Sequence, residues 1–321
     1  MSTHYDVFNG DADGIIALLQ LRFSEPKDSV LVTGVKRDIK LLKQVQEKSG
    51  DSVTVLDISM EKNSDDLHRI LMADIPVFYA DHHRAGDIIE SPLLDAHIDL
   101  DPNTCTSLII NNLLGGQYLH WAIVAAYGDN LIAIADKLAI TSGLSIQRSA
   151  QLKELGTLIN YNGYGSSVDD LHFAPADLYR QLAPYTSPFD VLEDKTSPYH
   201  TLKSGYDSDI ANANALEVYA KTQKCSAYMM PDEAWSKRIS GVFGNELANE
   251  SPDNAHIVFT ENADGTYTVS LRAPLNNKQG AGDICSRFTT GGGRAAAAGV
   301  NALPEDMLEA FIKAVDEYYS E

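Results

Sequence analysis

Carboxylates and imidazoles gather in four short segments of the chain, and such side chains together can hold divalent metal ions. The segments are Asp11-Ala12-Asp13, Val55-Leu56-Asp57, Asp81-His82-His83 and Tyr127-Gly128-Asp129-Asn130. A single Asp at the end of a strand usually caps a helix or starts a turn. Four such groups in one crevice would instead form a dense negative cluster, which needs a cation.

The donor types favour Mn²⁺ or Mg²⁺ over zinc. Carboxylates with a single imidazole suit these harder ions, whereas zinc favours more His and Cys. Two ions about 3.5–4 Å apart, bridged by one carboxylate, would hold a hydroxide and clamp a phosphate. The three cysteines, Cys105, Cys225 and Cys285, lie far apart in the sequence and are expected to be buried free thiols.

Alternating strands and helices are expected to position these segments. Strands are expected at residues 5–8, 29–35, 52–57 and 75–80, and helices after Gly14 and at residues 38–48. This alternation indicates βαβ units, so the expected fold class is α/β with a largely parallel sheet. In an open parallel sheet, function gathers at the carboxyl ends of the strands, where the four segments would lie.

The second half of the chain changes character. Helices are expected at residues 104–114, with Thr104 or Thr106 as the cap, and at 119–138, as a buried pair interrupted near Gly128. Residues 145–225 are polar, helical and broken by prolines. Strands are then expected at 239–243, 256–260 and 267–272, with a hairpin turn at 262–265, a helix starting at Arg294 and a closing helix at 304–319.

The order of these motifs resembles that of the DHH phosphoesterases, and residues 291–299, Gly-Gly-Gly-Arg-Ala-Ala-Ala-Ala-Gly, resemble the associated DHHA1 domain. The motifs span residues 8 to 299, so the resemblance covers nearly the whole chain. It implies a parallel-sheet catalytic domain at residues 1–190 and a connector at 191–235. A smaller mixed α/β substrate-binding domain would follow at 236–321, with the substrate in a cleft between the two domains.

The resemblance also implies roles for individual residues. Asp11 would bind one metal ion and Asp13 the other, Asp57 would bridge them, and His82 and Asp129 would complete the second site. His83 would donate a hydrogen bond to the substrate phosphate, and Asp81 would orient the His pair. The implied cofactor is two Mn²⁺ ions, with Mg²⁺ as the alternative.

Asn9 departs from the family pattern. Many members place a His two or four residues before the first Asp of the D-x-D pair, where this chain has Asn9 and Val7. An amide oxygen is a weaker, neutral ligand. His4 lies about 16 Å from Asn9 along an extended strand and cannot substitute. The first metal site is therefore expected to be weak, filled only with substrate, or completed by water.

Glycines 291–293 and the following arginine suggest an anion site. Three consecutive glycines, Gly291, Gly292 and Gly293, allow close approach of backbone N–H groups to a phosphate. Many DHHA1 domains have His where this chain has Arg294, and an arginine adds a bidentate fork. Arg272 is a second candidate for substrate binding. The alternative interpretation of the Gly/Ala run is tight packing.

The charge of the chain limits its partners. There are 45 acidic and 25 basic residues, a formal net charge of −20, which opposes binding along long DNA. The expected substrate is a dinucleotide or other very short oligonucleotide. The alternatives are a cyclic dinucleotide, a 3′,5′-bisphosphate nucleotide, pyrophosphate, or a catalytically decayed nucleotide-binding regulator. No apolar stretch predicts a membrane span, a cytoplasmic location is expected, and a homodimer is left open.

Overall fold

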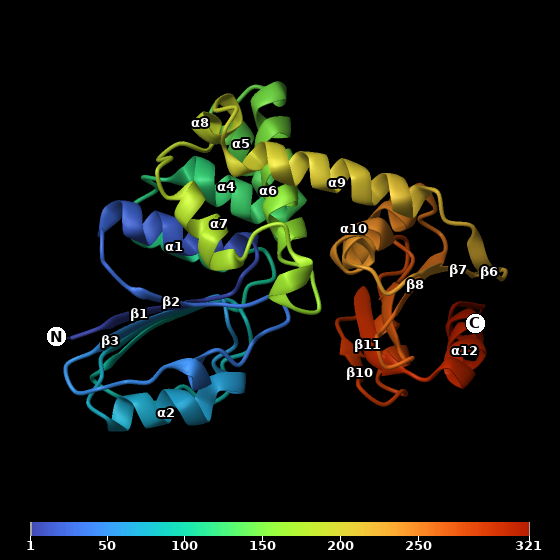
Figure 1. Ribbon diagram of the computed structural model, residues 1–321, viewed down its shortest axis with the longest axis horizontal. Coiled ribbons are helices and arrows are strands. Elements are labelled where there is room, and N and C mark those ends of the chain that lie inside the picture. Colours follow the sequence, from blue (N-terminus) through green and yellow to red (C-terminus); the bar gives the residue numbers. More distant parts are fainter. Residues whose placement is uncertain (1, 321) are drawn as a thin grey trace. The chain divides into compact units, whose positions relative to one another are not determined.

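A five-stranded parallel sheet lies at the centre of the N-terminal half (Figure 1). Its strands are β1 (His4–Phe8), β2 (Val30–Val32), β3 (Ser52–Leu56), β4 (Val77–Asp81) and β5 (Leu94–Ile98), in the spatial order β2-β1-β3-β4-β5. The structure is a computed structural model that describes residues 2–320, and the chain divides into two units, Met1–Ser204 and Gly205–Glu321. The predicted α/β class and parallel sheet are confirmed.

The strand order reverses between β1 and β3. β2 lies on one side of β1, whereas β3, β4 and β5 follow on the other, with Val7 opposite Val55 and Phe8 opposite Leu56. In an open α/β sheet, ligands bind outside the carboxyl ends of the strands at such a reversal. The segments that follow β1 and β3 carry Asp11 and Asp57.

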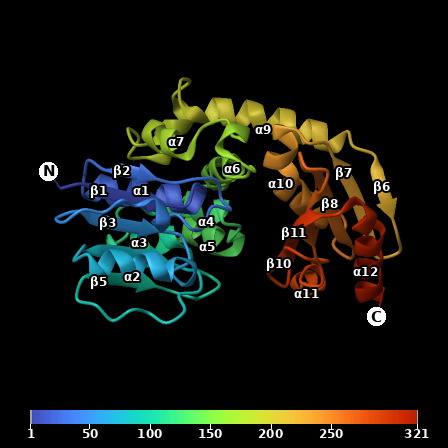
Figure 2. The same ribbon diagram turned by 60° about the horizontal axis from the view of Figure 1, so that its bottom comes forward.

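Helices cover both faces of this sheet (Figure 2). One face packs against α1 (Ala12–Ser24), and α1 in turn contacts α3 (Thr106–Leu113), α4 (Leu119–Gly128), α6 (Ile146–Asn162) and α7 (Pro175–Leu182). The other face is covered by α2 (Ser64–Met72), whose Leu67 and Ile70 are fully buried against Val7 and Val55. Each such buried side chain contributes about 1.5–3 kcal/mol. The remaining helices of the unit are α5 (Ile132–Thr141), α8 (Pro188–Glu193) and the start of α9 (Pro198–Asn214).

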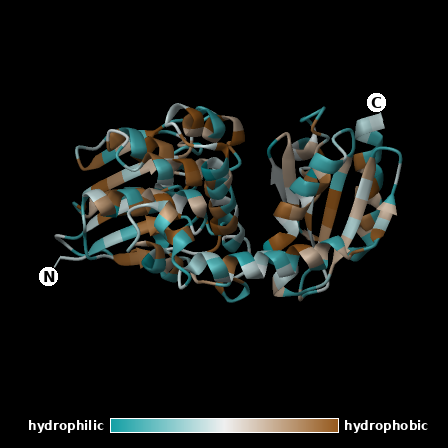
Figure 3. Ribbon diagram, turned by 90° about the horizontal axis from the view of Figure 1, so that it is seen from above, coloured by the Kyte–Doolittle hydropathy of each residue, from teal (hydrophilic) through white to brown (hydrophobic). Residues whose placement is uncertain are grey.

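The C-terminal unit contains a six-stranded mixed sheet in the order β10-β11-β9-β8-β7-β6. Its strands are β6 (Val218–Lys221), β7 (Cys225–Met230), β8 (Ala255–Glu261), β9 (Tyr267–Arg272), β10 (Gly291–Gly293) and β11 (Ala297–Leu303). Its helices are α10 (Ala234–Glu250), α11 (Ala281–Cys285) and α12 (Leu308–Ser320). Alternate residues of β9 are buried, so one face of the sheet joins a core with Phe259 and Phe311. Figure 3 shows apolar residues concentrated along the strands and polar residues in the loops.

Several predicted elements are confirmed. The helix pair interrupted near Gly128 is α4 and α5, the hairpin is β8 and β9, and the closing helix is α12. Cys105, Cys225 and Cys285 are buried free thiols. No helix within residues 2–320 combines the length and the apolar character needed to cross a membrane.

Other predicted elements are wrong. Residues 38–48 form no α-helix and contain only a short 3₁₀ turn (Leu42–Gln44), because the Asn63 side chain bonds to Ile39 O and Leu42 N. Residues 239–243, predicted as a strand, lie within α10, where Ile239, Phe243 and Leu247 are buried at the four-residue spacing of a helix. The edge strand β5 was not predicted.

The second sheet also begins before the expected domain boundary at residue 236. β6 and β7 already belong to it, and β7 pairs with β8 in parallel. Most of the expected connector at residues 191–235 is therefore regular structure, with α9 followed by two strands.

Candidate metal centre

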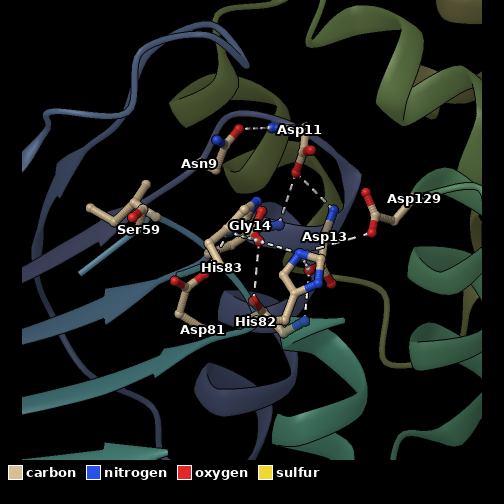
Figure 4. A network of polar contacts seen from close by, with 12 residues as sticks. Asn9, Asp11, Asp13, Gly14, Ser59, Asp81, His82, His83 and Asp129 are labelled. Carbon is tan, nitrogen blue, oxygen red and sulfur yellow. Dashed lines mark hydrogen bonds and ion pairs between the residues drawn. The ribbon is translucent and has the colours of Figure 1, made fainter. Parts of the chain in front are cut away.

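The four carboxylate and imidazole segments meet at the carboxyl edge of the parallel sheet (Figure 4). Asp11 and Asp13 follow β1, Asp57 follows β3, and Asp81 ends β4 and leads into His82. Asp129 enters from the end of α4. Asp57 has a φ of +60°, a left-handed conformation that is uncommon for any residue but glycine. Such backbone conformations cluster at functional sites, where surrounding structure enforces them.

Asp13 is held by the start of α3. Its Oδ2 accepts a hydrogen bond from Thr106 N and its Oδ1 from Ser107 N, both at 2.7 Å, and Ser107 Oγ donates to the carbonyl of Asp13 at 2.8 Å. The sequence predicted that Thr104 or Thr106 would cap this helix. The N-cap is instead Cys105, which makes no side-chain cap, and the Asp13 carboxylate takes that role.

His82 presents one ring nitrogen to three carboxylates. Its Nδ1–H donates to Thr104 O at 3.1 Å, so Nε2 is left with a free lone pair. Nε2 lies 3.5 Å from Asp57 Oδ1, 3.8 Å from Asp13 Oδ2 and 3.9 Å from Asp129 Oδ2. Neighbouring and opposite ligands of an octahedral ion with 2.1 Å bonds are about 3.0 and 4.2 Å apart. His82 Nε2 is thus within reach of three carboxylates, and Asp57, His82 and His83 place ligand atoms within 4.8 Å of one another, a spacing that fits one metal ion. The oxygen-rich donor set favours Mn²⁺ or Mg²⁺.

His83 lies beside this group and bonds to Asp81. Its Nδ1–H donates to Asp81 Oδ1 at 2.7 Å, and its side chain is 35% exposed. Burial alone lowers the pKa of His83, but the hydrogen bond and charge of Asp81 outweigh it, and the net direction is upward. Asp81 was expected to orient both imidazoles. It contacts His83, whereas His82 is oriented by the Thr104 carbonyl.

The carboxylates of the centre repel one another. Burial, together with the charges of Asp13, Asp11, Asp81 and Asp129, raises the pKa of Asp57 well above its usual range. A buried carboxylate among others is stabilised when a divalent ion binds between them.

Lys36 is a site residue that no sequence motif predicts. It follows β2, and its Nζ lies 2.6 Å from Asp11 Oδ2 and 3.9 Å from Asp129 Oδ1. Burial opposes the charge of Lys36, but Asp11, Tyr164 and Asp129 outweigh it and raise the pKa of Lys36 well above its usual range. In turn the Lys36 charge overcomes the effect of burial and holds the pKa of Asp11 at about 2. The one sequence feature that points to Lys36 is its position in the loop after β2, the strand that pairs with β1.

The glycine run of the C-terminal unit forms β10, which pairs with β11 in an antiparallel hairpin. The predicted helix at Arg294 is absent, because Arg294 N bonds to Ala297 O at 2.9 Å and closes a tight turn. A side chain at Gly291 would overlap the carbonyl oxygen of Cys285, and Gly293 has a φ of +143°. Tight packing thus accounts for two of the glycines, whereas Gly292 faces open space.

The two arginines predicted to bind substrate differ in whether their guanidinium groups are already engaged by the protein. The guanidinium of Arg272 donates to Asn245 Oδ1, Ser270 Oγ and Gly241 O, so it ties β9 to α10. Arg294 is exposed, and within residues 2–320 it forms no ion pair. Of the predicted C-terminal contacts, Arg294 is the one whose charge is free for a ligand.

Comparison with known proteins supports the same fold. Residues 221–321 match the family model described as DHHA1 domain. Solved structures similar over 99% of this chain include exonuclease RecJ bound to manganese, with 15% identity, a TM-score of 0.61 and 90% of that chain covered. RecJ in complex with Mn²⁺ from Thermus thermophilus has 16% identity and a TM-score of 0.64, with 52% covered.

The pGpG-specific phosphodiesterase PggH from Vibrio cholerae is also similar, with 11% identity and a TM-score of 0.54 over 99% of this chain and 98% of that one. No curated protein sequence matches the chain. At these low identities, the structural similarity establishes the fold alone.

Proposed function

We propose that this chain is a metal-dependent phosphodiesterase of the DHH/DHHA1 type that acts on nucleic-acid or nucleotide substrates, because residues 221–321 match the DHHA1 domain and the whole chain has a fold similar to that of RecJ and PggH. The observation that carries the proposal is His82 Nε2, which lies within 3.9 Å of three carboxylates and has its other nitrogen fixed by Thr104 O. Mn²⁺ or Mg²⁺ is the proposed ion, in keeping with the oxygen-rich donor set.

Each residue of the centre has a task in this reaction. Asp13, Asp57, His82 and Asp129 would hold the ion, which supplies Lewis acidity toward the phosphate oxygens when bound. His83 shares its Nδ1 proton with Asp81, so its Nε2 edge is the one left to meet a substrate. The raised pKa of His83 favours the protonated ring, which can donate a hydrogen bond to a phosphate oxygen.

The proposed substrates are very short oligonucleotides, with dinucleotides cleaved to mononucleotides. Two observations support this choice. The formal charge of −20 opposes long polyanions, and the exposed Arg294, which forms no ion pair within residues 2–320, supplies a local cation for one phosphate or base edge. The similarity to a protein named as a pGpG-specific phosphodiesterase points in the same direction.

End-labelled RNA of two to ten nucleotides, digested with Mn²⁺ and followed as a product ladder, tests the proposal. We expect the cleavage efficiency to fall steeply from two nucleotides upward. Arg294→Ala should lower kcat/KM for dinucleotides. The loss of one charge-assisted contact corresponds to about 1.5–3 kcal/mol of transition-state free energy, and the effect on a small generic phosphodiester should be smaller. Arg180→Ala, another exposed arginine, is the matched control.

Other outcomes would redirect the assignment. Equal rates on two- and ten-nucleotide RNA would reject length selection. The alternatives are then a cyclic dinucleotide, a 3′,5′-bisphosphate nucleotide or pyrophosphate as substrate. Nucleotide binding with no ester cleavage at any Mn²⁺ concentration would indicate a regulatory binding protein instead.

A further inference from the structure

We propose that the ammonium group of Lys36 occupies the place of the first metal ion, so that each chain binds one divalent ion instead of two. The inference rests on the proposed metal-dependent function and defines the composition of its centre. It revises the expectation of two ions that the D-x-D pair raised. Three sets of contacts carry it, around Asp11, Lys36 and Asn9.

Both carboxylate oxygens of Asp11 already have partners. Oδ1 accepts hydrogen bonds from the backbone N–H groups of Asp13 at 3.0 Å and Gly14 at 3.1 Å, and so caps α1. Oδ2 lies 2.6 Å from Lys36 Nζ. A metal ion at Asp11 would either displace the helix cap at Oδ1 or share Oδ2 with the Lys36 ammonium.

The chain fixes Lys36 in this position at several points. Its Nζ also donates to Asn160 Oδ1 at 3.0 Å and lies 5.5 Å from the centre of the Tyr164 ring. Its backbone N–H donates to Gly163 O at 2.9 Å. Only 29% of its side chain is exposed, so Lys36 does not swing freely in solvent. Anchored at both backbone and side chain, it is a preorganised cation.

Asn9 supports Lys36 and does not face an ion. Its side-chain oxygen accepts a hydrogen bond from Asp11 N at 3.2 Å, and its side-chain nitrogen donates to Lys36 O at 3.1 Å. An imidazole ligand at residue 9 could not reproduce both amide bonds. The replacement of the usual His by Asn and the presence of Lys36 therefore form one arrangement, in which a fixed cation substitutes for an exchangeable one.

The remaining ligands suffice for a single ion. Asp13, Asp57 and Asp129 each place a carboxylate oxygen within 3.9 Å of His82 Nε2, and Asp129 Oδ1 lies 3.9 Å from Lys36 Nζ. A second divalent ion on Asp11 would share that one carboxylate with the Lys36 ammonium, and positive charges held so close together repel.

Metal stoichiometry of the full chain tests this inference without using activity. The protein is equilibrated with Mn²⁺ by dialysis. The bound ions per chain are counted by elemental analysis, and their magnetic coupling is measured by electron paramagnetic resonance. We expect the wild type to bind one Mn²⁺ per chain, with the six-line spectrum of an isolated ion. The double variant Asn9→His with Lys36→Met should bind two ions, and spin coupling between ions about 3.5–4 Å apart should broaden that spectrum.

Two further variants keep the outcome decisive. Lys36→Arg preserves the charge and should remain at one ion, as should Lys40→Met, an exposed lysine of the same segment. Two coupled ions in the wild type would overturn the inference and leave the proposed function intact. No bound ion in the wild type would overturn both. One ion in a double variant that keeps its circular dichroism spectrum would show that Lys36 is not what excludes the second ion.

Discussion

Replacing Asp57 by Asn should stabilise the metal-free protein and remove its response to metal. Asp57 is buried at a φ of +60°, a conformation that Asn adopts at least as readily as Asp. The new amide oxygen can still accept the hydrogen bond that Thr106 Oγ1 donates at 3.1 Å. The substitution therefore removes a negative charge while it preserves the shape of the turn.

The expected gain follows from the charges around His82. Asp57 Oδ1 and Asp13 Oδ2 lie 3.5 and 3.8 Å from His82 Nε2, and are thus at most about 7 Å apart. Two such charges repel by about 2 kcal/mol at an effective dielectric constant of about 20. Exchanging a charged acceptor for a neutral one weakens the Thr106 bond by about 1 kcal/mol. The net gain is about 1 kcal/mol, or about 2–4 °C in Tm.

This gain should depend on pH. Since the pKa of Asp57 is raised above the unfolded value of 3.8, the native state retains a proton that the unfolded state has released. Wild-type stability then falls as pH rises through the folded pKa, and the Asn variant lacks this fall. The difference between the two proteins should be largest above the folded pKa of Asp57 and vanish as the pH falls toward 3.8.

Thermal unfolding in EDTA and in Mn²⁺, followed by circular dichroism across pH 4–8, measures both effects. Mn²⁺ should raise the Tm of the wild type and leave the Tm of the Asn variant unchanged. Asp28→Asn, which neutralises an exposed carboxylate, is the control. A lower Tm for Asp57→Asn in EDTA than for the wild type, or an undiminished response to Mn²⁺, would refute the electrostatic reasoning.

Two predictions concern the rest of the fold. Arg22→Met should reduce the free energy of unfolding by about 3–5 kcal/mol in urea titrations, because it leaves the buried Asp6, which Arg22 contacts at 2.6 Å, without its charge partner. Burial raises the pKa of Asp6, but hydrogen bonds from His4 and Arg22 hold it at about 2, so this stabilisation is present at neutral pH and should disappear between about pH 4 and 2. Gly291→Ala should cost about 1–3 kcal/mol through overlap with α11, whereas Gly292→Ala, which meets open space, should cost far less. Equal Tm values for the two alanine variants would contradict this account of the glycine run.

The carboxylate side of the centre could be predicted from sequence because a parallel sheet brings strand ends together. Asp13, Asp57 and His82 each follow an apolar run, so their meeting required only the topology. Lys36 gave no comparable signal. Its role depends on Asn160, 124 residues further along the chain, and on a loop whose path local patterns do not specify.

Local patterns also misled where tertiary packing decided the structure. Residues 239–243 combine a β-branched residue with an aromatic one, which favours a strand, yet Ile239 and Phe243 face the core from one side of a helix. The small residues after Arg294 indicated a helix start. Pairing of β11 with β9 made them a strand instead.

The contact between Asp13 and the start of α3 bears on the order in which the chain folds. α3 has no side-chain cap of its own, and its first two N–H groups bond to a carboxylate 93 and 94 residues earlier in the chain. An eight-residue helix without a local cap is marginal on its own in water. α3 should therefore become stable only after the turn between β1 and α1 has formed, and amide hydrogen exchange at Thr106 and Ser107 should report the closure of that long loop rather than the formation of the helix itself.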